Sequence, residues 1–150
     1  MGKKRVVKLS EEQLLKEKER LDKALKKEIK VKKIKGIKRG KIYISSSYNN
    51  TILTLTDEKG NVIAWSSTGK VGFKGTKKGS PFAAARATEL LVETINKLGL
   101  EEIEVFVKGI GVGRQSALRT LATKGVNIVA IEDVTPIPHN GCRPPRPRRV

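Results

Sequence analysis

The sequence is poor in the residues that build disulfides, metal sites and membrane spans. It contains one cysteine and one histidine in 150 residues, so it can form no internal disulfide. A structural zinc site needs four ligands, so the H-x-x-C spacing of His139 and Cys142 predicts no metal site. No apolar run approaches the roughly 20 residues of a spanning helix, which argues against a membrane protein. The basic start of the chain lacks the apolar stretch of a secretory signal, and a single cysteine fits a reducing cytosol. We therefore expect a cytoplasmic location.

Acidic residues are also scarce, and the end of the chain has none. The chain has 32 lysines and arginines against 15 acids, a formal net charge of +17. Residues 1–41 hold 17 basic residues against 6 acids, and residues 135–150 hold no acid. The end of the chain carries four tail arginines: Arg143, Arg146, Arg148 and Arg149. Because such a charge makes a compact protein repel itself, it predicts a polyanionic partner. The candidates are nucleic acid, an anionic membrane surface and an acidic protein.

Apolar periodicity predicts an α/β core between two basic ends. A helix is expected over 10–29, with Leu14, Leu21, Leu25 and Ile29 as a narrow apolar stripe. Strands are expected over 41–47, 51–57, 61–67, 102–108 and 126–134, and helices over 81–98 and 114–124. The last strand is mostly apolar, so we expect it to be buried on both faces. We therefore divide the chain into a basic helical extension and linker (1–40), an α/β core (41–134) and an extended tail (135–150).

This order of elements predicts where the loops meet. A right-handed strand–helix–strand connection makes the third, fourth and fifth strands parallel. The lysine loop (69–80), the GIGVG loop (109–113) and the tail all follow the carboxyl ends of those strands, and the SYNN turn (47–50) returns to the same edge. The acidic turn DEKG (57–60) falls at the opposite edge. We expect the basic and glycine-rich parts to share the sheet edge where open α/β sheets bind ligands.

The motifs at that edge fit nucleic acid better than catalysis. GIGVG has the spacing GxGxG, which is not the GxGxxG of dinucleotide loops, and the chain contains no GxxxxGK[ST]. The sequence therefore predicts no nucleotide cofactor. The loop glycines and the helix start at Arg114 and Ser116 suit a backbone phosphate, although a tight turn would also need glycine. The lysine loop suits phosphates and one stacked base, although a solvated surface loop would look similar. A two-metal nuclease needs acids from several strands to converge, and the sequence shows no such set of carboxylates.

Four segments carry a resemblance to a known family. They are SYNNTILTLTD (47–57), GFKGTKKGSPFAA (72–84), VKGIGVGRQSALR (107–119) and DVTPIPHNGCRPPRPRRV (133–150). Together they closely resemble the small-subunit ribosomal protein eleven family of bacterial type, from about residue 41 to the C-terminus. The resemblance implies a ribonuclease-H-like, three-layer α/β/α fold with a mixed five-stranded sheet. That fold would serve as a scaffold and not as an enzyme, and it would need no cofactor.

The resemblance also implies a place and partners. The protein would sit on the platform of the small ribosomal subunit and bridge helices of its RNA, near the cleft that holds the messenger's ribosome-binding sequence. Ribosomal proteins seven and eighteen would be its neighbours. The RNA-facing residues would be Asn49, Asn50, Lys70, Phe73, Lys74, Lys77, Lys78, Arg114, Ser116, His139, Asn140, Arg143, Arg146, Arg148 and Arg149. The alternative is a free nucleic-acid-binding chaperone or nucleoid protein, and a nuclease is a more distant one.

Overall fold

A mixed five-stranded sheet with two helices makes up the part of the chain that the structure describes. The structure is a computed structural model that describes residues 15, 19 and 37–143. Its elements are β1 (Arg39–Ser46), β2 (Thr51–Thr56), β3 (Val62–Ser67), the 3₁₀ helix η1 (Gly75–Gly79), α2 (Pro81–Leu98), β4 (Glu102–Lys108), α3 (Gly113–Thr123) and β5 (Ile128–Asp133). The predicted order of strands and helices is confirmed, and η1 is an addition within the lysine loop. The helix predicted over 10–29 lies outside the described residues, apart from Leu15 and Glu19.

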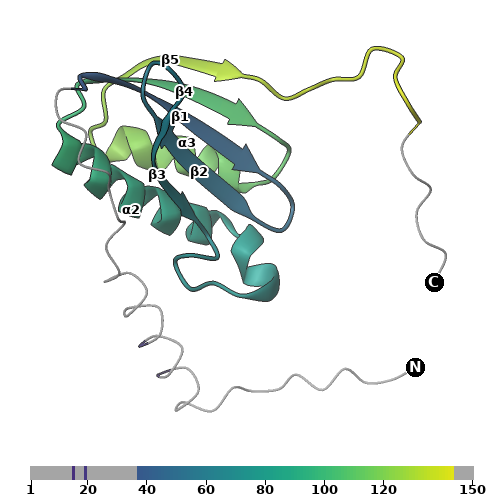
Figure 1. Cartoon of the computed structure of the whole chain (residues 1–150). Helices are drawn as coiled ribbons and strands as arrows, with labels where there is room; N and C mark the ends of the chain where they lie inside the picture. The colour runs from purple at the N-terminus through teal and green to yellow at the C-terminus, as the bar shows by residue number, and fades with distance from the viewer. Residues whose placement is uncertain (1–14, 16–18, 20–36, 144–150) are drawn as a thin grey trace.

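The order of strands in the sheet is β3-β2-β1-β4-β5. The β3–β2 and β2–β1 pairs are antiparallel, whereas β1–β4 and β4–β5 are parallel. Strands β1, β3, β4 and β5 therefore run in one direction, and β2 runs against them. The crossovers through α2 and α3 both move across the sheet toward β5, so right-handed connections place both helices on the same face. Figure 1 shows α2 and α3 side by side behind the sheet.

The expected three-layer arrangement is wrong for the described residues, which form two layers. Ile42 and Ile44 of β1 are buried against the helices, whereas Tyr43 between them points to the other face and is 38% exposed. The same alternation leaves Trp65 of β3 49% exposed. The reason is topological, because both crossovers advance in one direction and leave no described element to cover the second face. This face carries Trp65, Tyr43 and Phe106 on three strands.

Strand β5 was expected to be buried on both faces, and this expectation is also wrong. Val129 and Ile131 are 60% and 56% exposed. The strand pairs with β4 on one side and lies at the end of the sheet. An apolar run indicates a strand, but it does not tell a central strand from an edge strand.

The start and end of α2 follow the sequence signals. The Ser80 hydroxyl accepts a hydrogen bond from the backbone N–H of Ala83 at 3.2 Å, and Pro81 occupies the first turn. Gly99 ends the helix with φ 68°, a left-handed conformation that favours glycine. The first turn of α2 therefore begins directly after the lysine loop. None of the helices in the described part of the chain is long and apolar enough to cross a membrane.

Candidate nucleic-acid interface

The turn between β1 and β2 lies between the two glycine-containing loops. A methyl group added at Gly79 would overlap the carbonyl oxygen of Tyr48, and one added at Gly111 would overlap that of Ser47. The Gly111 N–H donates to the Ser46 carbonyl at 3.0 Å. The predicted convergence of the turn, the lysine loop and the GIGVG loop at one sheet edge is therefore confirmed. Three segments that are distant in the sequence form one continuous surface, which we call the loop edge.

Several polar residues that were predicted to face RNA instead hold the loop edge together. The Asn50 side-chain oxygen accepts a hydrogen bond from the Thr68 hydroxyl at 2.5 Å, which joins the turn to the end of β3. The Ser116 hydroxyl donates to the Pro81 carbonyl at 2.7 Å, which joins the first turns of α2 and α3. Asn49, in contrast, is exposed on the turn. Asn50 and Ser116 thus have a clear structural role.

Arg114 is paired within the protein. Its guanidinium donates to the Gly109 carbonyl at 2.9 Å and to the Asp133 carboxylate at 2.5 Å. The same carboxylate accepts hydrogen bonds from the Thr135 hydroxyl at 2.6 Å and from its N–H at 3.0 Å. The Thr135 hydroxyl in turn accepts from the Gly109 N–H at 3.0 Å. These contacts attach the start of the tail to the GIGVG loop.

The electrostatics of Asp133 reflect this cluster. The hydrogen bond from the Thr135 hydroxyl, and then that from Arg114, lower the pKa of Asp133 from 3.8 to about 2. The carboxylate is therefore charged throughout the neutral range and neutralises Arg114 locally. Arg114 consequently contributes less free positive charge to the loop edge than the sequence suggested.

Two backbone donors of the GIGVG loop are engaged within the protein. The N–H groups of Gly109 and Gly111 are taken by Thr135 and Ser46. A methyl group at Gly113 would meet the Thr51 hydroxyl and lie 3.0 Å from the Ala84 methyl. Of the two interpretations of this motif, the tight turn fits better than the phosphate cradle. Glycine is needed here because the loop packs directly on the β1–β2 turn.

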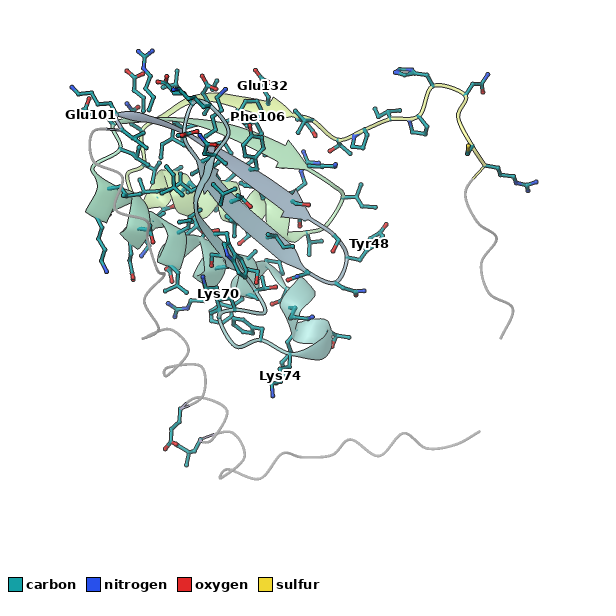
Figure 2. The ribbon with its side chains drawn as sticks, viewed as in Figure 1. Tyr48, Lys70, Lys74, Glu101, Phe106 and Glu132 are labelled. Atoms are coloured by element: carbon teal, nitrogen blue, oxygen red, sulfur yellow. The ribbon has the colours of Figure 1, made fainter. Side chains whose placement is uncertain are left out.

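The lysine loop contains both exposed and engaged side chains. Lys74 is exposed on it and points away from the body of the protein (Figure 2). Lys70 instead donates to the Trp65 carbonyl at 3.0 Å and places its ammonium group 4.5 Å from the centre of the Trp65 ring. Partial burial lowers the pKa of Lys70. Phe73 packs against the core and contacts Phe82 edge to face, with the ring centres 6.0 Å apart. The exposed Phe82 is therefore more accessible to a base than Phe73.

The tail leaves the body of the protein beyond β5, at the loop edge (Figure 1). His139, Asn140 and Arg143 are exposed. Asn140 has φ 56°, the one positive value at a described residue other than glycine. Arg146, Arg148 and Arg149 lie outside the described residues. The acidic turn at 57–60 is far from this surface, because it joins the opposite ends of β2 and β3.

Sequence reasoning missed Tyr48 and the cluster of Asp133 and Thr135. Tyr48 is 77% exposed at the tip of the turn. Its place in SYNN, among residues that favour turns, was a signal that could have identified it. Nothing in the sequence pairs Asp133 with Arg114, because 19 residues separate the two positions.

The fold and the loop edge define an α/β protein of net charge +17 that presents a lysine-rich loop and the start of its tail at one edge of its sheet. The family model described as ribosomal protein S11 matches residues 40–149. The small ribosomal subunit protein uS11 of Solibacter usitatus (strain Ellin6076) is 50% identical over 125 residues, which cover 83% of this chain and 93% of that protein.

The chain belongs to the ribosomal protein S11 family. The family confirms the resemblance found in the sequence. It also confirms that the chain is a structural ribosomal protein and not an enzyme, and that it acts in the ribosome in the cytoplasm.

Proposed function

We propose that the chain binds and bridges helices of small-subunit ribosomal RNA through the loop edge and the tail. Its place would be the platform of the subunit, near the cleft that holds the messenger's ribosome-binding sequence, with ribosomal proteins seven and eighteen as neighbours. The observation that carries the proposal is the packing of the turn between the two loops, because it brings the turn, the lysine loop and the GIGVG loop together on one surface. The platform, the cleft and the neighbours rest on the family resemblance.

The predicted RNA-facing residues divide into two roles on this proposal. The exposed ones would contact RNA directly: Asn49, Lys74, Lys77, His139, Asn140 and Arg143. Lys78, which is partly exposed in the lysine loop, would join them. The engaged ones would shape the surface that RNA meets: Asn50, Lys70, Phe73, Arg114 and Ser116. Lysine suits phosphate as a point charge, whereas arginine binds it with two parallel hydrogen bonds. The tail arginines would therefore add the stronger phosphate contacts.

We also propose that the core is a ribonuclease-H-like scaffold. The mixed sheet with both helices on one face supports this view, although the scaffold has two layers over the described residues. On this proposal the core (41–134) positions the loops and the tail (135–150) reaches further into RNA. The basic extension (1–40) would be a separate segment, although its last two residues, Arg39 and Gly40, belong to β1.

The experiment compares two exposed lysines that lie at opposite edges of the sheet. Lys74→Ala removes an exposed charge from the loop edge, and Lys59→Ala removes one from the opposite edge as a matched control. Binding to a platform-domain fragment of ribosomal RNA is titrated with salt. We expect Lys74→Ala to flatten the slope of log K against log salt by about 0.7 to 0.9, the value for one lost phosphate contact. Equal slopes for the two variants would contradict the proposed interface.

A second measurement separates a ribosomal component from a free nucleic-acid chaperone. A ribosomal component sediments with small subunits in one-to-one ratio after a wash at high salt. A chaperone or nucleoid protein would be released, because its binding is mainly the salt-dependent electrostatic kind.

A further inference from the structure

The aromatic residues of this chain differ in whether the protein itself contacts their rings. The chain has six of them, and all six lie in the described part. Tyr43 stacks on Phe106, with ring centres 5.1 Å apart, and Phe73 contacts Phe82 edge to face. Trp65 lies under the ammonium group of Lys70. Among the described residues no ring or cation contacts the sixth aromatic ring, that of Tyr48, which is 77% exposed. Figure 2 shows Tyr48 pointing outward from the tip of its turn.

The backbone beneath Tyr48 is held firmly. The Ser47 N–H donates to the Asn50 carbonyl at 2.9 Å, and the Ser47 hydroxyl accepts from the Asn50 N–H at 3.2 Å. Gly79 packs on the Tyr48 carbonyl from the lysine loop, and Gly111 packs on the Ser47 carbonyl from the other side. The ring is thus presented from a turn that is closed by hydrogen bonds and wedged between two loops. Little backbone entropy would be lost when it binds a partner.

The surroundings of the ring favour RNA as that partner. The neighbouring lysine loop and GIGVG loop contain no acid. The acid near this edge, Asp133, is paired with Arg114. Proteins recognise single-stranded RNA largely by stacking unpaired bases on aromatic side chains while nearby cations bind the backbone. A presented tyrosine ring between lysines and asparagines has this composition.

We propose that the Tyr48 ring stacks on an unpaired base of ribosomal RNA at the loop edge. The inference rests on the proposed function and deepens it, because it adds a specific base contact to the phosphate contacts proposed for the lysines and arginines. A phosphate contact positions the protein on the RNA, whereas a stacked base requires an unpaired nucleotide at a defined place. Tyr48 would therefore fix the register of the loop edge on the RNA.

The test measures binding of the full chain to the platform-domain RNA fragment. Tyr48→Ala should weaken binding about 5- to 150-fold, the range for loss of one stacked base. The salt slope should stay at the wild-type value, since the ring neutralises no phosphate. Tyr48→Phe should bind within about twofold of the wild type because it keeps the stacking face, and Tyr48→Leu should resemble Tyr48→Ala. Val62→Ala is the matched control, because it removes an exposed apolar side chain on the opposite edge.

The outcomes separate this inference from the proposed function. If the wild type binds with the expected salt slope and Tyr48→Ala binds equally well, stacking is wrong and the proposed interface stands. If the wild type does not bind the fragment, the proposed function itself fails. If Tyr48→Ala binds the isolated RNA normally but is lost from assembled subunits, Tyr48 contacts a protein, which also overturns the inference. Chemical probing adds a direct readout, because one unpaired base should become reactive with Tyr48→Ala and remain protected with Tyr48→Phe.

Discussion

Replacing Gly111 by alanine tests whether the GIGVG loop needs glycine for close packing. The added methyl group would lie 2.8 Å from the carbonyl carbon of Ser47 and 2.5 Å from the Ser46 hydroxyl oxygen. Carbon atoms in van der Waals contact are about 3.5 to 4.0 Å apart, so the loop must move by roughly 1 Å. That movement would also stretch the hydrogen bond from the Gly111 N–H to the Ser46 carbonyl.

The expected loss of stability follows from these two effects. Overpacking costs about 1 to 3 kcal/mol, and a lost hydrogen bond costs about 1 kcal/mol more. For a folded core of about 100 residues, 1 kcal/mol lowers Tm by roughly 4 °C or more. Gly111→Ala should therefore unfold at least about 8 to 16 °C below the wild type in a calorimetric scan.

Gly69→Ala is the matched control for this experiment. It lies in the other loop, and an added methyl group would make an ordinary contact of 3.6 Å with the Lys78 side chain. We expect it to change the stability by less than about 0.5 kcal/mol. A Gly111→Ala variant that unfolds within a degree of Gly69→Ala would refute the close-packing argument.

Three further predictions concern the tail arginines, Asp133 and the N-terminal residues 1–29. Replacing the four tail arginines by alanine should flatten the salt slope of RNA binding by roughly 3, at about 0.7 to 0.9 per phosphate. A change in slope below about 1 would show that these arginines bind no phosphate. Replacing them by lysine should keep most of the slope, and Cys142→Ser should change RNA binding little. Because the folded-state pKa of Asp133 is lowered to about 2, its stabilising contribution should be full above about pH 4 and lost as the pH falls toward 2. The difference in Tm between the wild type and Asp133→Asn should therefore shrink over that window, and a constant difference would exclude this role. Deleting residues 1–29, which hold a nearly balanced charge in their predicted helix, should leave incorporation into small subunits intact, as measured by sedimentation.

The general arrangement of the core was predictable because it follows from rules that act locally or apply to all chains. The apolar periodicity located each strand, and Ser80 and Gly99 marked the ends of α2. Right-handed crossovers then determined which loops share an edge. The exposure of β5 was not predictable in this way. It follows from the position of β5 at the end of the sheet, and that position is set by the final crossover.

The roles of single residues at the loop edge were less accessible to sequence reasoning. Asn50, Arg114 and Ser116 have residue types that suit RNA, but each meets a partner from a distant part of the chain. Those partners are 18, 19 and 35 residues away. Composition identifies a side chain that can bind RNA. It does not show whether the fold has already engaged that side chain.

Three glycines hold the two loops of the loop edge close to the β1–β2 turn. The methyl positions of Gly79, Gly111 and Gly113 are occupied by the β1–β2 turn or by the residues that flank it. A side chain at these positions would push the loops away from the turn. The backbone donors of Gly109 and Gly111 are used within the protein. On the proposed function, the glycines would act on RNA binding by holding the two loops against the turn.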